Sequence, residues 1–435
     1  MTEPFSRPSS IQIPALHSFG GEIRLPGSKS ITNRAFLIAA LAKGKTKLCN
    51  LLRSDDTRYM GAALNELGVK IDFNEDYSEA VVNGLGAPIE CDKKEGAELY
   101  LGNAGTAMRS LCAALTLGRG LFCLRGEERM KERPIRDLVE ALRSLGAEID
   151  YEESDGYPPV RIHANGLKGG LVKVRGNISS QYLTALLICA PYAKEPLHIQ
   201  VEGPLISAPY ILLTLDVMKK FGIEVRHENL TDFYVPQGVY QSLEVYNVEG
   251  DASSASYPLA AAAITGGTVR VLGLGSNSIQ GDLAFTKVLQ QMGAQIEIGP
   301  DYVECTGKEL CAVDLNLNDI PDAAMTVAVL ALFAKGTSRI SGIASWRVKE
   351  TDRIAAISAE LQKVGATVVT DNDSITITPP ETLLPATIET YNDHRMAMCF
   401  SLVALGGVPI KILDPACVNK TYPTYFEDFL KHASL

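Results

Sequence analysis

Hydrophobic and polar positions follow a pattern that recurs along the chain. A helical segment ends in an apolar residue and a glycine, and a segment of alternating apolar and polar residues follows, as in SLGAEID at 144–150. The pattern occurs five times, with its glycines at Gly68, Gly146, Gly222, Gly293 and Gly365. Glycine tolerates the left-handed conformation in which many helices end, and alternation is typical of a half-buried strand. Each of the five occurrences therefore predicts a helix that is followed closely by a strand.

A second series of segments interleaves with the first. Each begins with Gly, Ser, Asn or Asp and continues as a helix that is apolar nearly all round; the segments are 28–44, 102–118, 177–193, 250–266, 319–336 and 392–407. A helix with apolar residues on every side has to be buried. The copies recur at intervals of roughly 70–75 residues and contain strands as well as helices, which excludes a solenoid. We therefore expect an α/β fold of six repeated units, with three units in each of two domains, buried helices inside and sheets outside.

Length and composition narrow the functional classes. A chain of 435 residues favours two domains, and its net charge of −10 argues against nucleic acid or an anionic membrane as a partner. The N-terminal residues lack the apolar segment of a signal peptide, and apolar stretches such as 325–334 are shorter than the ~20 residues of a membrane span. The nine cysteines are dispersed and the six histidines lack metal-type spacing. We expect a cytoplasmic protein with reduced thiols and no metal site.

The polar segments that open the buried helices are candidates for an anion site. The first turn of a helix offers free N–H groups and a partial positive charge, so several such ends could bind an anion together. For any one helix, however, Ser, Asn and Asp are also ordinary N-caps. In LPGSKSITNRA (25–35), Lys29 and Ser30 begin a helix and Arg34 follows one turn later. The spacing does not match a phosphate-binding P-loop, and a solvated cationic turn is the alternative.

Three further motifs carry cations. The loop that holds Arg129 also contains glutamates, and by itself it suggests a salt-bridged loop. In WRVKETDR (346–353), Lys349 and Arg353 are four residues apart, which predicts two cations on one helix face with Glu350 between them. In YNDHRMAM (391–398), Arg395 falls in the first turn of a buried helix, where a cation opposes the helix dipole. A residue placed against its local preference is a candidate for function.

Two carboxylates accompany these cations. Asp322 precedes a wholly apolar helix, where its alternative role is that of an N-cap, and Glu350 lies within the second cationic motif. One acid and one base beside a bound anion are the groups that proton transfer requires.

Taken together, the motifs resemble those of the enolpyruvyl transferase family, and among its members the 5-enolpyruvylshikimate-3-phosphate (EPSP) synthases. The resemblance runs from about residue 20 to the C-terminus and rests on seven motifs in order: LPGSKSITNRA, LGNAGTAMR, ERMKERPI, SSQYLTALL, IPDAAMT, WRVKETDR and YNDHRMAM. It implies two domains, 1–27 with 250–435 and 28–249, each of three α/β units, which close on the substrates like a clamp.

The resemblance also implies a reaction. Phosphoenolpyruvate would give its enolpyruvyl group to the 5-hydroxyl of shikimate 3-phosphate and release phosphate, without a metal or organic cofactor. The residues that would hold shikimate 3-phosphate are Lys29, Ser30, Arg34, Ser179, Ser180, Ser207, Asp322 and Lys349. The residues that would hold phosphoenolpyruvate are Lys29, Gly105, Arg129, Gln181, Arg353, Arg395 and Lys420.

Three of these residues would have catalytic roles in an addition–elimination reaction through a tetrahedral intermediate. Asp322 would act as base on the attacking hydroxyl, Glu350 would exchange the proton with the methylene carbon, and Lys29 would protonate the leaving phosphate. Both carboxylates would stabilise cationic character at the central carbon. The partners implied are small molecules only, and we expect a monomer.

Two positions depart from the pattern of the EPSP synthases. Ser110 stands where proline is usual and Ser345 where asparagine is usual, so a side-chain contact to substrate is not assigned to Ser345. Glyphosate occupies the phosphoenolpyruvate site in this family, and we expect Ser110 to lower the sensitivity to it.

Two alternatives remain. The sister enzyme that acts on UDP-N-acetylglucosamine carries a reactive cysteine where this chain has Glu128, and Cys123 falls earlier on a predicted strand. A non-catalytic anion-binding protein on the same scaffold would have no use for Asp322 and Glu350.

Overall fold

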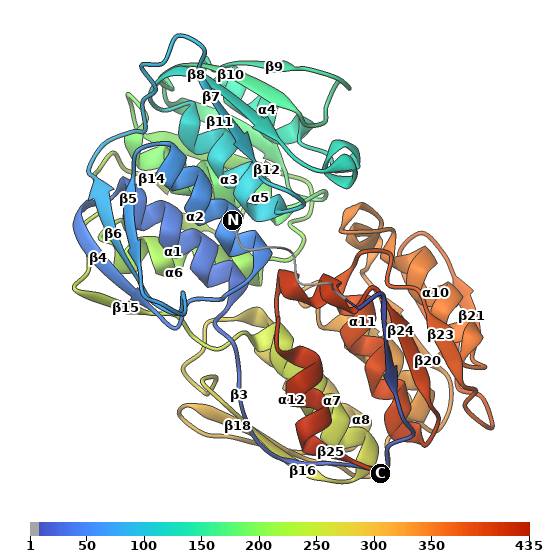
Figure 1. The fold of residues 1–435 in the computed structure, drawn as a ribbon. Helices are drawn as coiled ribbons and strands as arrows, with labels where there is room; N and C mark the ends of the chain where they lie inside the picture. Colours follow the sequence, from blue (N-terminus) through green and yellow to red (C-terminus); the bar gives the residue numbers. More distant parts are fainter. Residues whose placement is uncertain (1–7) are drawn as a thin grey trace. The chain divides into compact units, whose positions relative to one another are not determined.

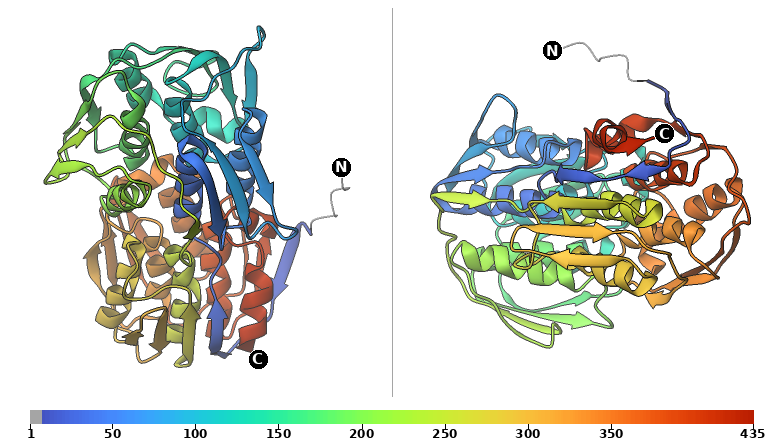
Figure 2. Two further views of the ribbon diagram at one scale, coloured as in Figure 1. Left: turned by 90° about the vertical axis from the view of Figure 1, so that its left-hand side faces the viewer. Right: turned by 90° about the horizontal axis from the view of Figure 1, so that it is seen from below.

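The computed structural model describes residues 8–435, and the chain divides into two compact units (Figures 1 and 2). Unit 1 contains the described residues up to Pro26 together with Gly250–Leu435, and unit 2 contains Gly27–Glu249. The chain therefore leaves unit 1 after its first strands and returns to it for the second half. The first seven residues, which belong to the predicted range 1–27 and to the segment judged to lack a signal peptide, lie outside the described residues.

Unit 2 is built from three four-stranded sheets of one topology. Their orders are β15-β4-β6-β5, β7-β8-β10-β9 and β11-β12-β14-β13. In each, the first two strands are parallel and the other neighbours are antiparallel. The strands are β4 (Lys43–Cys49), β5 (Lys70–Phe73), β6 (Ala80–Leu85), β7 (Ala97–Tyr100), β8 (Arg119–Arg125), β9 (Glu148–Tyr151), β10 (Val160–Asn165), β11 (Gly170–Arg175), β12 (Leu197–Glu202), β13 (Arg226–Glu228), β14 (Asp232–Val235) and β15 (Val245–Asn247).

The helices of unit 2 fall into the two predicted kinds. The buried helices are α1 (Lys29–Leu41), α3 (Gly105–Leu115) and α5 (Ser180–Cys189), and α3 packs against both α1 and α5. The amphipathic helices are α2 (Asp55–Glu66), α4 (Arg136–Ser144) and α6 (Pro209–Lys220). A short 3₁₀ turn at Glu128–Glu132 precedes α4, and another at Ala190–Tyr192 follows α5. The three buried helices form the core of the unit because every side of each is apolar.

Unit 1 repeats the same plan with one copy shortened. Two four-stranded sheets have the orders β17-β18-β16-β3 and β19-β20-β22-β21, and a three-stranded sheet has the order β1-β24-β23. The strands are β1 (Ser10–Ile13), β2 (Ser18–Phe19), β3 (Gly21–Arg24), β16 (Thr268–Leu272), β17 (Gln295–Ile298), β18 (Tyr302–Thr306), β19 (Asp314–Asn316), β20 (Ser338–Ser341), β21 (Thr367–Thr370), β22 (Ser374–Thr378), β23 (Ala386–Ile388), β24 (Ile410–Leu413) and β25 (Ala433–Ser434). In the sixth copy the N-terminal strand β1 pairs with β24, and β2 pairs with β25.

The helices of unit 1 repeat the division seen in unit 2. The buried helices are α7 (Ala252–Thr265), α9 (Ala324–Leu330) and α11 (His394–Ser401), and the others are α8 (Phe285–Met292), α10 (Arg353–Lys363) and α12 (Tyr425–His432). Short 3₁₀ turns lie at Gly281–Ala284, Ala331–Phe333, Ala344–Val348, Leu402–Gly406 and Pro415–Lys420. Helix α7 packs against α9 and α9 against α11, which makes these three helices the core of the unit.

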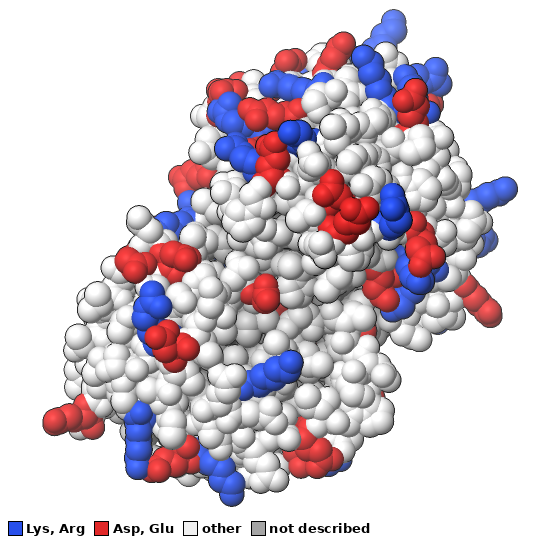
Figure 3. Space-filling model, turned by 180° about the vertical axis from the view of Figure 1, so that it is seen from behind, with Lys and Arg blue, Asp and Glu red and all other residues white. Residues whose placement is uncertain are grey.

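The predicted helix ends and the predicted fold class are confirmed. The five glycines of the recurring pattern have φ between 87° and 113°, the left-handed region that glycine adopts most easily. Among residues 8–435, no helix is long and apolar enough to cross a membrane. Acidic and basic side chains are interspersed on the face drawn in Figure 3.

Candidate functional site

The cationic motif of unit 2 lies at the start of helix α1. The helix begins at Lys29, whose Nζ lies 3.6 Å from Asp56 Oδ2. Ser28 precedes the helix without capping it through its side chain, so the polar residues here are not explained as a cap. Lys29 and Ser30 are half-buried and remain close to the N–H groups of the first turn.

Arg34 is a buried cation whose contacts are neutral. Its side chain is 4% exposed, and Nε donates to Thr214 Oγ1 at 2.9 Å. Its Nη1 donates to the Ser30 carbonyl at 2.9 Å, as the predicted one-turn spacing requires, and Nη2 reaches Thr184 Oγ1 at 3.2 Å and the Tyr210 carbonyl at 3.3 Å. Within the described residues no carboxylate lies within ion-pair distance of this guanidinium. Burial without an opposite charge lowers the pKa of Arg34 to about 10.

Gly105 begins helix α3 beside two guanidinium groups. A Cβ at this position would lie 2.6 Å from Arg133 Nη2 and 2.9 Å from Arg109 Nη1, so only glycine fits without displacing them. Arg133 is buried and its Nη1 donates to Asn103 Oδ1 at 2.7 Å and to the Asn103 carbonyl at 2.9 Å. Arg109 Nη2 donates to the Pro134 carbonyl at 2.8 Å. Two cations therefore converge on the first residue of a buried helix.

Arg129 lies in the same loop in a different environment. It belongs to the 3₁₀ turn Glu128–Glu132, it is half-buried, and its Nη1 pairs with Glu132 Oε2 at 2.5 Å. Sequence reasoning missed Arg133, because the run of alternating cations and glutamates gives no local reason to prefer one arginine. The close approach of Gly105, which no local pattern reveals, distinguishes Arg133.

The start of helix α5 brings three more of the predicted residues together. Ser179 is the N-cap, and its Oγ accepts from the Gln181 backbone N–H at 3.2 Å. Gln181 Nε2 in turn reaches Thr106 Oγ1 in the first turn of α3 at 3.4 Å, which links α5 to the helix that Gly105 opens. Ser180 is half-buried at the first position of α5, and Ser207 is buried in the turn before α6 with φ 53°. The capping interpretation therefore holds for Ser179.

Asp322 is the centre of a charged cluster in unit 1. Its Oδ1 accepts from Arg353 Nη1 at 2.9 Å and its Oδ2 from Arg395 Nη2 at 2.9 Å, while Lys349 Nζ lies 3.9 Å away. Helix α9 has Ala323 as its N-cap, and that cap makes no side-chain hydrogen bond. The N-cap position of α9 is therefore not Asp322, whose carboxylate instead binds cations from two other segments.

The predicted pairing of Lys349 and Arg353 on one helix face is also wrong. Lys349 follows the 3₁₀ turn Ala344–Val348, whereas Arg353 is the first residue of α10, which Asp352 caps by accepting from the Ala355 N–H at 3.2 Å. The chain changes direction between them, and both cations approach Asp322 from separate segments. Ser345, which stands where asparagine is usual in the resembling family, is half-buried in the 3₁₀ turn.

Arg353 is buried among three carboxylates. Its Nη2 donates to Glu350 Oε2 at 2.9 Å and its Nε to Asp393 Oδ2 at 2.7 Å, in addition to the bond with Asp322. Burial acts to lower the pKa of Arg353, but the charges of Asp393, Glu350 and Asp322 together outweigh this effect and raise it. Arg353 and Arg34 are thus opposites: both are buried, and only Arg353 is neutralised within the protein.

The remaining predicted residues border the same cluster. Lys420 Nζ lies 3.7 Å from Glu350 Oε1, and Arg395 also donates to Tyr257 Oη at 3.0 Å and to Ser253 Oγ at 3.1 Å. Asp393 was missed from the sequence: it caps α11 by accepting from the Arg395 N–H at 2.9 Å, so its position reads as an ordinary cap although its carboxylate also binds Arg353.

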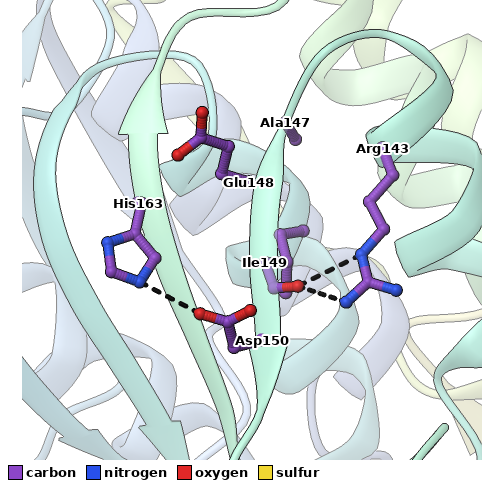
Figure 4. Close-up of a pocket in the computed structure, with 6 residues that line it drawn as sticks. All are labelled: Arg143, Ala147, Glu148, Ile149, Asp150 and His163. Carbon is purple, nitrogen blue, oxygen red and sulfur yellow. Dashed lines mark hydrogen bonds and ion pairs between the residues drawn. The ribbon is translucent and has the colours of Figure 1, made fainter.

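A cavity of about 380 Å³ lies elsewhere, between helix α4 and strands β9 and β10 (Figure 4). His163 Nε2 contacts Asp150 Oδ2 at 3.2 Å there, and Arg143 donates to the Ile149 carbonyl. None of the predicted site residues lines this cavity. It is therefore not the candidate site.

Comparison with known proteins identifies the family. The model of the family EPSP synthase (3-phosphoshikimate 1-carboxyvinyltransferase) matches residues 15–429. The chain belongs to the EPSP synthase family. A relative from a Sulfurovum species with the name 3-phosphoshikimate 1-carboxyvinyltransferase is 58% identical over 420 residues, 96% of this chain and 98% of that protein. A relative of the same name from Vibrio cholerae is 55% identical over 421 residues, 97% of this chain and 98% of that protein.

Solved structures agree with this assignment. The structure of EPSP synthase from Acinetobacter baumannii superposes with a TM-score of 0.80 at 26% identity, and the match covers 98% of this chain and 99% of that chain. An enolpyruvyl transferase from Streptomyces tendae has a TM-score of 0.79 at 17% identity, which concerns the fold alone. EPSP synthases are transferases, and neither the UDP-N-acetylglucosamine enzyme nor a non-catalytic protein is favoured by these findings.

Proposed function

We propose that the chain transfers the enolpyruvyl group of phosphoenolpyruvate to the 5-hydroxyl of shikimate 3-phosphate and releases phosphate. Family membership supports this reaction, and the observation that carries it for these particular residues is the state of Arg34. A guanidinium buried among hydroxyl and carbonyl groups is costly until an anion neutralises it. A carboxylate would match its planar donors in two parallel hydrogen bonds. Shikimate 3-phosphate supplies a carboxylate.

The other residues predicted to hold shikimate 3-phosphate fit the same proposal. Lys29 and Ser30, at the start of α1, and Ser179 and Ser180, at the start of α5, would bind shikimate 3-phosphate through side chains and helix N–H groups. Ser207, Asp322 and Lys349 complete its proposed contacts.

Phosphoenolpyruvate would be held by Lys29, Gly105, Arg129, Gln181, Arg353, Arg395 and Lys420. We add Arg133 to this set because its guanidinium lies beside Gly105, whereas Arg129 pairs with Glu132. An anion that approaches the first turn of α3 would meet Arg133 and the positive end of the helix dipole together.

The carboxylates of unit 1 would move the protons. Asp322 would take the proton of the attacking hydroxyl, and Glu350 would deliver a proton to the methylene carbon and then take one back. This forms the C–O bond and a methyl group in the tetrahedral intermediate, and the second step restores the double bond as phosphate leaves. Lys29 would protonate the departing phosphate. Glu350 would carry its proton at the start; once it has given that proton to the methylene carbon, both carboxylates are ionised and would stabilise positive charge at the central carbon.

One assay tests the reaction. Phosphate release would be measured with phosphoenolpyruvate and either shikimate 3-phosphate or UDP-N-acetylglucosamine as acceptor. We expect release with shikimate 3-phosphate only, together with the enolpyruvyl ether as product. Release with UDP-N-acetylglucosamine alone would assign the sister activity, and binding of both substrates without release would mark a non-catalytic protein. We further propose that the protein acts as a cytoplasmic monomer, which size-exclusion chromatography with light scattering would test for oligomeric state.

A further inference from the structure

Glu360 is a fully buried carboxylate outside the candidate site. It lies on α10, seven residues after Arg353, and its side chain is 0% exposed. Its two oxygens accept from Lys363 Nζ at 2.8 Å and 2.7 Å, from Tyr391 Oη at 2.7 Å and from the Glu389 backbone N–H at 3.2 Å. Moving a carboxylate out of water costs desolvation free energy, which these four contacts have to offset. The position of Glu360 therefore calls for a reason.

The segment that Glu360 holds is strained. Tyr391 and Asn392 both have φ 53°, and the Asp393 N–H donates to the Thr390 carbonyl at 2.8 Å across them. Two consecutive left-handed residues characterise a type I′ turn, for which Asn-Gly or Gly-Gly is the usual choice. A bulky residue such as tyrosine in this conformation is unfavourable and persists only where the surroundings impose it. The bond from Tyr391 Oη to Glu360 supplies such a constraint.

The strained turn leads directly into the charged cluster of unit 1. Asp393 follows Asn392, caps α11 and binds Arg353, and Arg395 is the second residue of the helix. Helix α10 therefore grips this segment at two points on one face: Arg353 binds Asp393, and Glu360, two helical turns further on, binds Tyr391 and the Glu389 N–H. The two points fix both the position and the direction of the turn.

We propose that Glu360 and Tyr391 are positioning residues that set the geometry of Arg353 and Arg395 through the turn 390–393. Neither side chain is assigned a contact with substrate. The inference rests on the proposed function in one respect, namely that Arg353 and Arg395 hold phosphoenolpyruvate. Loss of the Tyr391–Glu360 bond would let the turn relax, and the two arginines would no longer be held in the orientation that a small, doubly anionic ligand requires.

The test uses Tyr391→Phe and Glu360→Gln in the full-length protein, with Tyr77→Phe as the matched control. Tyr77 is another exposed tyrosine with positive φ, 60°, but it lies in unit 2. We expect Tyr391→Phe and Glu360→Gln each to raise KM for phosphoenolpyruvate by about fivefold, and to change KM for shikimate 3-phosphate by less than about twofold. The rise is smaller than the tenfold or more expected for losing a hydrogen bond between a charged group and the ligand itself, because the two residues act only through the turn. The double variant should be no worse than Glu360→Gln alone, because the Tyr391 hydroxyl acts through Glu360.

A second readout does not depend on activity. Hydrogen–deuterium exchange of the peptide that covers 389–395 should accelerate in Tyr391→Phe and in Glu360→Gln and stay unchanged in Tyr77→Phe. An active wild type with unchanged KM for phosphoenolpyruvate in the variants, equal rises in both KM values, or unchanged exchange would each overturn the positioning role. An inactive wild type would instead overturn the proposed function, and the exchange data alone would then judge whether Glu360 and Tyr391 hold the turn.

Discussion

Replacing Arg34 by methionine should make the unliganded protein no less stable while weakening acceptor binding. The guanidinium has a pKa of about 10 in place of its ordinary 12.5, a difference that corresponds to about 3 kcal/mol of unfavourable burial. The unfolded chain binds more protons than the folded one between pH 10 and 12.5, so this cost is complete at every pH below about 10 and fades only above it. Methionine has a similar length and no charge, so at neutral pH the substitution removes the cost of burying the guanidinium.

The hydroxyl groups that surround Arg34 remain satisfied in this variant. Thr214 Oγ1 already donates to the Tyr210 carbonyl at 2.8 Å and lies 3.1 Å from Thr184 Oγ1. We therefore expect the free energy of unfolding of Arg34→Met to equal that of the wild type or to exceed it by up to about 3 kcal/mol. Each kcal/mol shifts the melting temperature by about 2–4 °C for a unit of this size. The affinity for shikimate 3-phosphate should fall at least ~30-fold, because a bidentate charge pair is lost.

Arg353→Met is the matched control, because it removes a buried arginine that has three carboxylate partners. Those carboxylates would be left buried without their cation, so we expect a loss of about 3–5 kcal/mol. Thermal and urea unfolding, followed by circular dichroism, measure the free energy of unfolding. Titration with shikimate 3-phosphate measures the affinity for the acceptor. A loss of more than about 1 kcal/mol in Arg34→Met, or acceptor affinity equal to the wild type, would refute the interpretation of Arg34 as a cation held ready for an anion.

Three further predictions concern catalysis, inhibition and thiol chemistry. Glu350→Gln should bind both substrates and lose at least ~10² in turnover; near-normal turnover would remove Glu350 from the mechanism. Ser110 lies buried inside α3, so Ser110→Pro removes a backbone donor near Gly105. This variant should have a lower inhibition constant for glyphosate, with little change in KM for phosphoenolpyruvate. An equal or higher inhibition constant would contradict this prediction. Among the nine cysteines only Cys311 is exposed, so a thiol reagent should label it first, which peptide mass spectrometry would check.

The features that sequence predicted well are those with a local cause. Gly146 ends a helix because the residues on either side of it already favour a helix and a strand, and its φ of 93° follows from chemistry within a few positions. The apolar residues of 325–330 had to be buried wherever the rest of the chain went. The one-turn contact between Arg34 and the Ser30 carbonyl has the same local origin.

The partners of the charged residues were less predictable. Asp322 accepts from Arg353 and Arg395, which are 31 and 73 positions away, and no periodicity in the sequence encodes such a meeting. Lys349 and Arg353 were misplaced for a different reason. Asp352 is a strong helix-start signal that a spacing of four residues obscured, and giving it weight would have separated the two cations.

The pairing of the first strands with the last ones has a consequence for synthesis. β1 pairs with β24 in the register Ser10↔Leu413, and β2 pairs with β25 at the end of the chain. Unit 2 is contiguous and can fold as soon as residues 27–249 have left the ribosome. β1 and β2 emerge first and wait for partners made roughly 400 residues later, which is about 20–80 s at ordinary translation rates. During that interval their open backbone edges have no native partner, so a chain that stops before β24 leaves two strands available for pairing with another molecule.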